Sequence, residues 1–538
     1  MANVLLISPS DQFTLGVRTL SAVLKRAGHR CRIVILYTVH HNRDKKNLDV
    51  KSGYRGENSA CSDTEYDLLC EAIRDFDTDV IGLSLASQSF GLCAWLTEKL
   101  HRDFPKTPVM WGGVDPTLHP ELGIEHADYL ARGEAEDSLL ELLQLLGEGK
   151  DASKLEGFWV RRGSQVFQNP MRPLIQDLDR LPWPDYDKEE KFLIEADQIQ
   201  PIDKLWYIIL TQRGCPYRCT FCINSTLPNL SPNEKYVRRR SPQNTIGELK
   251  WIKSHYPDEL NFVWFWDDIF TISKKWLKEF APLYRDEIGI PFCCYTYPGQ
   301  CDDTIAECLN LMGVEFVHFG VESGSKETLN EVYGRKDPAG VVETAQVLHR
   351  HGIPYRVDLI AANPWETDDD HRQTLEILLQ CPHPFRVNPT NPLAFYFNLP
   401  ITKRAQAEGI PLRPVPGANA YLAVDDNHFH FWKNIFDLAQ YPHLDPDFIR
   451  HLARDPYFIE HPEFVIRFQE ALQKDYWAEA NGFTSKQDEI ESLRGEIARL
   501  RSKLEQIEGS PFYRAYRRAK ELIPVRNGGS QLAQAVSS

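Results

Sequence analysis

The chain has no long hydrophobic run and no excess of positive charge. The apolar stretch Val4–Ile7 near its start is far shorter than the ~20 residues that span a membrane, and too short for a signal peptide. The net charge is -15 at pH 7, which disfavours general binding to nucleic-acid phosphates. We therefore expect a cytoplasmic protein with no membrane span and no nucleic-acid partner, whose cysteines are thiols or metal ligands rather than disulfides.

Three of the cysteines stand close together in the chain, at Cys215, Cys219 and Cys222. A 4Fe-4S cube normally takes four thiolates, so a C-x3-C-x2-C loop leaves one iron open to a small molecule. Zinc is the alternative, but zinc sites favour C-x2-C pairs and four ligands, and no second Cys pair or H-x3-H follows at a zinc-like distance. The spacing therefore predicts a 4Fe-4S cluster with one open iron.

With Phe221 as the aromatic residue before the third cysteine, this loop resembles the C-x3-C-x-aromatic-C signature of the radical S-adenosylmethionine (SAM) superfamily. The resemblance implies that SAM binds the open iron through its amino and carboxylate groups. It further implies reductive cleavage of SAM to a 5'-deoxyadenosyl radical, with electrons from an external flavodoxin- or ferredoxin-like donor.

Residues 1–148 alternate β-type runs with helical patterns. Repeated βα units predict a doubly wound, flavodoxin- or Rossmann-like α/β sheet that binds ligands at the carboxyl ends of its strands. Strands are expected at Val4–Ile7, Cys31–Tyr37, Val80–Leu85, Pro108–Trp111 and Tyr129–Ala131.

Three loops of this region resemble the D-x-H-x-x-G, S-x-L and G-G signature of cobalamin-binding domains. The small residues would let the backbone approach a bulky corrin. Phe13 stands where the family has its cobalt-ligating histidine, so the resemblance implies cobalamin with no protein nitrogen on its lower face. The alternative is a flavodoxin-like domain without that cofactor. The residues that carry the resemblance are Asp11, Phe13, Gly16, Ser84, Gly112 and Gly113.

From residue 205 onward, six β-type runs recur with helices between them. This pattern predicts a partial (β/α)6 TIM-like barrel over residues 201–400, with its site at the carboxyl ends of the strands. The cysteine loop follows the first strand, as in radical SAM barrels. Strands are expected at Trp206–Thr211, Asn261–Trp266, Pro291–Tyr297, Glu315–Gly320, Pro354–Ile360 and Pro392–Phe397.

The string Gly320–Ser325 resembles the G-x-E-S-G-S string that contacts SAM in related enzymes. The resemblance implies that Glu322 accepts hydrogen bonds from ribose hydroxyls and that Ser323 and Ser325 reach the SAM carboxylate. The alternative for Ser325 is a helix N-cap. Asp267 and Asp268, after the second strand, either position SAM or substrate or start a helix.

The remaining segments carry weaker signals. Residues 149–200 are proline-rich and are expected to be an interdomain linker. Residues 401–482, rich in aromatic residues and His, are expected to be a C-terminal cap. Residues 483–524 are expected to be helical, and the a/d repeat over 490–507 either forms a homodimer or packs on its own domain. Residues 525–538 are expected to be disordered.

Together these resemblances imply a cobalamin-dependent radical SAM enzyme of the class B methyltransferase kind. Such an enzyme methylates an unactivated carbon of a small molecule through methylcobalamin and the 5'-deoxyadenosyl radical. Two alternatives stay open. One is a cyclase or rearrangement enzyme that uses the same cofactors without net methylation, and the other is a non-catalytic redox sensor that binds cobalamin or SAM.

Overall fold

The computed structural model of the chain describes residues 1–9, 14–37, 61–202, 205, 207–388, 390–423 and 426–480. Asp11, Phe13 and the segment 490–507 lie outside the described residues, as do residues 525–538. The predictions made for them therefore stay predictions. Residues 1–460 and 461–538 form separate compact units, and each is described by itself.

The N-terminal region forms a sheet that, within the described residues, has nine strands in the order β7-β6-β5-β4-β3-β1-β2-β8-β9. Its centre is parallel, as a doubly wound fold requires. The central strands are β1 (Asn3–Ser8), β2 (Arg30–Leu36), β3 (Val80–Ser84), β4 (Val109–Gly112) and β5 (Tyr129–Ala131).

Helices cover both faces of this sheet because successive side chains of a strand point to opposite faces. Leu5 and Ile7 of β1 join one apolar cluster with residues of α2 and α3, while Val4 and Leu6 join another with residues of α1 and α6. The expected doubly wound fold is confirmed. The helices are α1 (Leu15–Arg26), α2 (Asp63–Asp75), α3 (Phe90–Asp103), α4 (Val114–Leu118), α5 (Pro120–Gly123) and α6 (Glu136–Gly147).

The expected linker, residues 149–200, contributes four strands to this sheet within the described residues. Strands β6 (Phe158–Arg162) and β7 (Gln165–Gln168) form an antiparallel hairpin beside β5, and β8 (Lys191–Glu195) and β9 (Gln198–Pro201) form one beside β2. The two hairpins extend both edges of the sheet. The proline-rich stretch 169–186 lies between them and interrupts neither hairpin.

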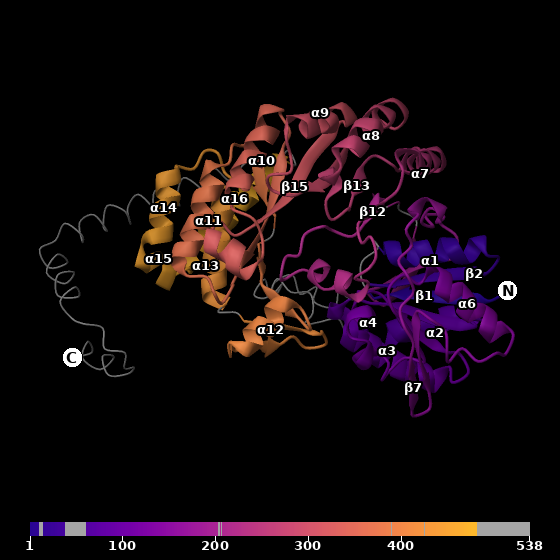
Figure 1. Ribbon diagram of the computed structural model, residues 1–538. Helices are drawn as coiled ribbons and strands as arrows, with labels where there is room; N and C mark the ends of the chain where they lie inside the picture. The colour runs from indigo at the N-terminus through magenta and orange to yellow at the C-terminus, as the bar shows by residue number, and fades with distance from the viewer. Residues whose placement is uncertain are drawn as a thin grey trace, which may run out of the picture. The chain divides into compact units, whose positions relative to one another are not determined.

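A second sheet forms the partial barrel, and its main path in the described residues has six parallel strands in chain order. Helices connect consecutive strands, and in Figure 1 helices α8 and α9 lie along the same side of β13 and β15. The expected (β/α)6 architecture is confirmed. The strands are β10 (Ile208–Ile209), β13 (Val263–Phe265), β14 (Phe292–Thr296), β15 (Val314–Glu322), β16 (Tyr355–Ala361) and β17 (Phe385–Val387).

The barrel helices are α7 (Pro242–His255), α8 (Lys274–Glu287), α9 (Asp303–Met312), α10 (Ala339–Arg350) and α11 (Asp368–Gln380). Each lies in the chain between two consecutive strands of the barrel path. Right-handed crossovers of this kind place the loops after the strands at one end of the barrel.

The sixth barrel strand is β17, so the expected strand at Pro392–Phe397 was wrong. β17 has only three residues with Arg386 in the middle, which is too short for an alternating pattern to be visible. In the expected range, β18 (Asn391–Pro392) pairs with β16, and β19 (Ala394–Tyr396) joins a small antiparallel sheet. The middle strand of that sheet is β21 (Ala420–Leu422), which pairs with β19 on one side and with β20 (Arg413–Pro414) on the other.

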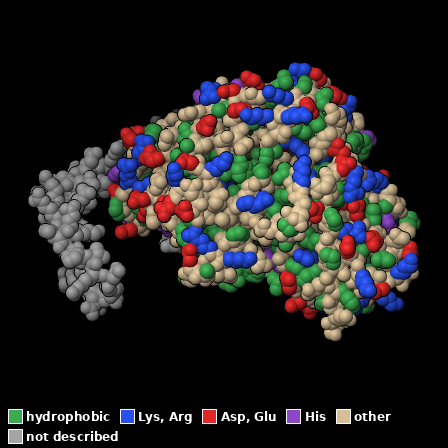
Figure 2. All heavy atoms as spheres, in the orientation of Figure 1, with side chains coloured by type: hydrophobic (Ala, Val, Ile, Leu, Met, Phe, Trp, Pro, Cys, Tyr) green, Lys and Arg blue, Asp and Glu red, His purple; other side chains and the backbone are tan. Residues whose placement is uncertain are grey.

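The C-terminal cap is mainly helical but also contains β20 and β21, and α13 packs against α11 of the barrel. No described helix is long and apolar enough to cross a membrane. Figure 2 shows basic and acidic side chains interspersed over the visible face. The helices of this region are α12 (Pro400–Ala407), α13 (Asp426–Leu438), α14 (Pro446–Arg454) and α15 (Pro456–Glu460), with α16 (Glu463–Ala480) in the second unit.

Candidate functional site

A cavity of about 490 Å³ lies between the carboxyl ends of the first sheet's strands and the start of the barrel. The cavity wall from the first sheet includes every described residue that the sequence predicts to approach cobalamin. They are Gly16, Ser84, Gly112 and Gly113.

The opposite wall of the cavity comes from the chain around the cysteine loop. It includes Arg213 and Gly214, which directly precede Cys215, and Ile223, which directly follows Cys222. The structure therefore brings the expected cobalamin residues and the neighbours of the expected cluster ligands to one cavity.

The wall of the cavity from the first sheet combines glycines with apolar side chains such as Leu6, Leu15 and Met110, which suits a large, mostly apolar group. Gly113 has φ +110°, and a Cβ there would lie 2.5 Å from the carbonyl oxygen of Leu85, so the position requires glycine. A side chain at Gly82 would collide with Leu6, whose Cδ2 lies 2.8 Å from the ideal Cβ. The described residues that line the cavity include no histidine. This wall fits a corrin or its nucleotide tail.

The cysteine loop is largely buried and is attached to the barrel. Cys215 and Cys219 are each 8% exposed, and Cys222 is half-buried. The Thr220 N–H donates to the carbonyl of Tyr333 (3.0 Å), and its hydroxyl donates to the carbonyl of Val332 (2.6 Å). These bonds attach the loop to the π-helix Thr328–Val332.

Binding to iron requires the three thiols to lose their protons. Burial raises the pKa of Cys215 to about 12 and that of Cys219 to about 11. The negative charges of other cysteines in the loop raise both pKa values further. A cube takes one thiolate at each bound iron, so its ligands need not converge on a point. Among the residues that the structure describes, no three His, Cys, Asp or Glu side chains converge as one metal ion requires.

Two residues that the sequence patterns did not indicate lie beside Cys222. The Asn224 side-chain amide donates to the Cys222 sulfur (3.8 Å) and to Asp268 (3.3 Å), and Tyr236 donates to its oxygen (2.7 Å). Phe221 packs edge-on against Tyr333, with ring centroids 5.0 Å apart. Asn224 stands two residues after the third cysteine, so its position was visible in the sequence, but nothing there indicated its role.

Asp267 and Asp268 make different contacts. Asp267 is 1% exposed and accepts from the N–H groups of Thr211 (2.7 Å) and Gln212 (2.6 Å), which ties the end of β10 to β13. Burial raises the pKa of Asp267 to about 6. Asp268 is exposed and bonds instead to Asn224. Asp268 alone of the two contacts the surroundings of the cysteine loop.

Glu322 ends β15 in a strained conformation, with φ +62°. Its carboxylate accepts from the guanidinium of Arg335 (3.0 Å), which also donates to the carbonyl of Gly320 (2.7 Å). Burial raises the pKa of Glu322 to about 7 although the charge of Arg335 opposes the shift. Non-glycine residues at such φ values cluster at functional sites. Arg335 was not expected, because no motif includes it.

Ser323 and Ser325 are buried and their hydroxyls bond to protein groups. Ser323 donates to Glu366 (2.5 Å) and accepts from the N–H of Ser325 (3.0 Å). The Ser325 hydroxyl accepts from the N–H of Thr328 (3.2 Å), which is the helix-cap alternative. A contact of either serine with SAM stays a prediction.

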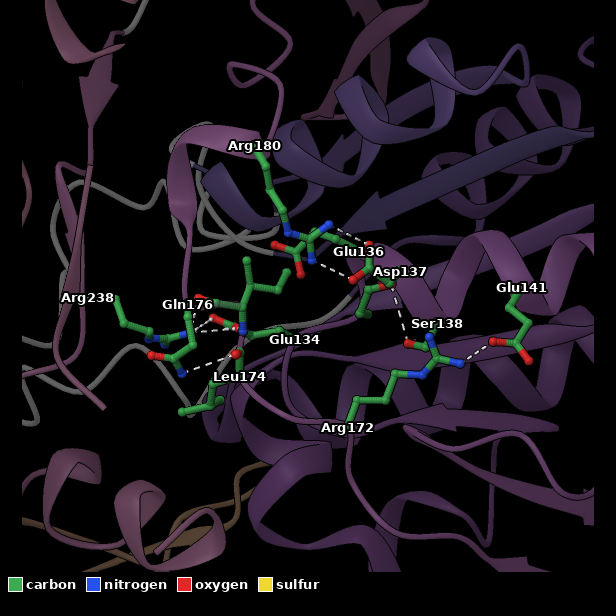
Figure 3. Close-up of polar contacts among 12 residues, drawn as sticks. Glu134, Glu136, Asp137, Ser138, Glu141, Arg172, Leu174, Gln176, Arg180 and Arg238 are labelled. Atoms are coloured by element: carbon green, nitrogen blue, oxygen red, sulfur yellow. Dashed lines mark hydrogen bonds and ion pairs between the residues drawn. The ribbon is translucent and has the colours of Figure 1, made fainter. Parts of the chain in front are cut away.

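An ion-pair network beside the cavity joins the first sheet's domain to the barrel. Glu134, after β5, accepts from Arg213 (2.7 Å) and from Arg238 (2.8 Å), and Figure 3 shows Arg238 directed at Glu134. Glu136 accepts from Arg213 (2.6 Å). These pairs link residues 77 to 104 positions apart in the chain, and no local pattern predicts them.

Comparisons with known proteins agree with this division of the chain. Residues 4–143 match the B12 binding domain, and residues 209–378 match the Radical SAM superfamily. The chain is 26% identical to an uncharacterized methyltransferase of Pyrococcus horikoshii, over 58% of this chain and 67% of that protein. It is also 26% identical to the anaerobic magnesium-protoporphyrin IX monomethyl ester cyclase of Synechocystis, over 54% of this chain and 55% of that protein.

Among solved structures, the chain resembles the cobalamin-dependent S-adenosylmethionine radical enzyme OxsB with aqua-cobalamin and S-adenosylmethionine bound. The TM-score is 0.62, with 14% identity over 98% of this chain and 82% of that one. At this identity the likeness establishes the fold.

Proposed function

Because the chain belongs to the cobalamin-dependent radical SAM enzymes, we propose that it transfers a methyl group to an unactivated carbon of a small molecule. The observation that carries the proposal is the shared cavity. Its walls come from the glycines after the strands of the first sheet and from the residues on either side of the cysteine loop. Methyl transfer requires cobalamin and the SAM-binding cluster to serve one substrate, and this arrangement supports that requirement.

When bound, the cluster with SAM supplies a 5'-deoxyadenosyl radical and cobalamin supplies the methyl group. The thiols of Cys215, Cys219 and Cys222 would hold the cluster. The chain orients them through the two Thr220 hydrogen bonds and through Asn224, which donates to the Cys222 sulfur.

Other residues prepare the surroundings of the loop. Phe221 packs within an apolar cluster that includes Tyr333 and Phe395, which excludes water from that side. Glu322, held by Arg335, offers a buried carboxylate at the strand end where SAM would bind. Gly112 and Gly113 would let cobalamin approach the backbone of the first sheet.

A second candidate function is cyclisation or rearrangement with the same cofactors and no net methylation. The likeness to a protein named as a cyclase favours it as the alternative. A non-catalytic sensor is not favoured, because the chain matches the family of radical SAM enzymes over its barrel. Product mass separates methylation from cyclisation.

The proposal includes partners that the described residues do not contain. Reductive cleavage of SAM consumes an electron, so we infer an external donor of the flavodoxin or ferredoxin kind. We further propose that the protein works in the cytoplasm, where its thiols stay reduced. A homodimer through 490–507 is a proposal that rests on the a/d repeat alone.

The test is anaerobic reconstitution with iron, sulfide and cobalamin, followed by reduction in the presence of SAM. We expect 5'-deoxyadenosine and, with an extract that contains the substrate, a product heavier by one CH2 unit. The variant with Cys215, Cys219 and Cys222 all replaced by Ala should lose the cluster and both products. Four irons per chain in that variant would refute the cluster assignment, and products without a mass gain would favour the cyclase alternative.

A further inference from the structure

The inner face of the barrel is not filled by an apolar core. Along β15, Val317, Phe319 and Val321 are buried on the side of the helices, so His318 between them faces the barrel interior. Closed TIM barrels fill this interior with bulky branched side chains. Here the neighbours of His318 are polar or aromatic and remain partly exposed. They are Trp264, Tyr295, Asp358 and Asn388.

Four rings form a nearly parallel row across this face. The His318 ring lies 4.8 Å from that of Tyr295 and 6.2 Å from that of Trp264, at interplanar angles of 23° and 15°. Trp264 in turn lies 5.7 Å from Trp266, at 17°. The row includes Trp266, which is 37% exposed, an unusual exposure for so large an apolar side chain.

Trp266 stands at the same end of the barrel as the cysteine loop. It follows the last residue of β13 and comes two residues before Asp268, whose carboxylate bonds to Asn224 beside Cys222. A ring stacked on Trp266 would therefore lie near the carboxyl ends of the strands, where barrel enzymes place their reactions.

Polar groups adjoin His318 in this row. The Asn388 amide donates to Asp358 (2.7 Å) and to Nδ1 of His318 (3.0 Å). Because Nδ1 accepts, the proton of the neutral imidazole is on Nε2. His318 is 2% exposed, and its Nε2 has no hydrogen-bond partner within the described part of the chain. A buried donor without a partner is unfavourable until an acceptor arrives.

The face therefore combines a flat apolar surface with a carboxylate acceptor and an unpaired donor. Burial lowers the pKa of His318 to about 4, so the imidazole is neutral near pH 7 and has a single N–H donor. It also raises the pKa of Asp358, although Asn388 donates to this carboxyl. An aliphatic chain would use neither the ring row nor the fixed acceptor as well as a flat ring that carries a donor.

We propose that this face binds a planar aromatic or heteroaromatic substrate whose ring stacks on Trp266 and whose N–H or O–H donates to Asp358. The proposal rests on the proposed function, because it names the substrate class of the same enzyme. An acceptor atom on the same molecule would pair with Nε2 of His318.

The test uses two probes, indole and 1-methylindole, which share a flat ring while only indole has a donor. Binding to the reconstituted full-length protein is titrated by saturation-transfer NMR. We expect indole to bind saturably, and Asp358→Asn to weaken indole about tenfold or more while leaving 1-methylindole unchanged. Trp266→Ala should weaken both probes by up to about tenfold, and Trp266→Phe should restore part of the loss.

The matched control is Tyr457→Ala, which removes another exposed aromatic ring, 52% exposed on α15. It should leave both probes unaffected. The proposal is overturned if indole does not bind saturably, if Tyr457→Ala weakens it as much as Trp266→Ala, or if Asp358→Asn weakens both probes equally. Binding needs no turnover, so a protein that forms 5'-deoxyadenosine but does not bind indole refutes this proposal alone. One that binds indole as expected but never methylates its substrate refutes the proposed function alone.

Discussion

Replacing Glu134 by glutamine is expected to weaken the contacts between the first sheet's domain and the segments next to the cysteine loop, which we call the joint. The Glu134 carboxylate accepts from Arg213 (2.7 Å), from Arg238 (2.8 Å) and from the N–H of Ile175 (2.7 Å). It therefore connects three separate segments. The amide of the Glu134→Gln variant would keep the shape of the carboxylate but place N–H groups against guanidinium groups.

The magnitude follows from burial. The side chain of Arg238 is 4% exposed and that of Glu134 is 14% exposed, so the variant leaves a nearly buried charge without its carboxylate. Removing one partner of such a pair destabilises by about 3 to 5 kcal/mol. A local loss of about 3 kcal/mol corresponds to roughly a hundredfold increase in the open population of the joint.

Glu141→Gln is the matched control. Glu141 of α6 pairs with Arg172, in the same part of the molecule (Figure 3), but its side chain is 48% exposed. Exposed pairs contribute about 0 to 1 kcal/mol, so this variant should change little.

Hydrogen exchange followed by mass spectrometry measures the effect locally, which avoids assuming two-state unfolding in a chain of this size. Peptides that contain β11 (Gln212–Arg213) and β12 (Arg238–Arg239) should exchange roughly a hundredfold faster in the Glu134 variant. Cobalamin binding should weaken in the same variant, because Glu134 lines the cavity. Equal exchange in the two variants, or unchanged exchange in both, would refute the reasoning.

Three further predictions follow from the site. Glu322→Ala should weaken SAM binding about ten- to a hundredfold in equilibrium dialysis while the cluster spectrum stays intact, and loss of the cluster would instead assign Glu322 a structural role. Burial raises the pKa of Glu366 from 4.5 to about 7, so the stability it contributes is present below pH 4.5 and lost as pH rises to 7. Glu366→Gln should remove about 3 kcal/mol of that pH dependence from the local stability of α11, measured by hydrogen exchange corrected for its intrinsic pH dependence, and identical pH profiles would contradict it. If Phe13 stands where the cobalamin-binding family has its cobalt-ligating histidine, as the sequence resemblance implies, paramagnetic resonance of bound Co(II) cobalamin should show no three-line nitrogen splitting, and a clear triplet would refute this.

The elements that could be predicted were those with a strong local pattern. The strand Tyr129–Ala131 has the expected bounds, and the apolar runs of β1 and β3 were recognised because central parallel strands are buried on both faces. Strand β17 was missed because three residues around Arg386 carry no readable period. The hairpins on both sides of residues 169–186 were missed because the prolines between them predict a linker over the whole segment.

The same distinction applies to the candidate site. Cys215, Cys219 and Cys222 were recognisable because their spacing is local to one loop. Glu134 and Arg335 were not, because an ion pair between distant segments depends on tertiary packing that no local pattern records. The serines of the Gly320–Ser325 string were found by resemblance, but only the structure shows that their hydroxyls already bond to Glu366 and Thr328.

The end of β13 explains how adjacent residues reach different parts of the site. Trp266 joins the ring row on the inner face, Asp267 bonds to Thr211 and Gln212 beside β10, and Asp268 bonds to Asn224 near Cys222. Successive side chains of an extended strand point to opposite faces, so a shift of one residue would exchange these positions. It would place a carboxylate in the aromatic row and remove the acceptor from the end of β10. The pairing of β13 with β10 and β14 therefore sets the inner face and the surroundings of the cysteine loop together.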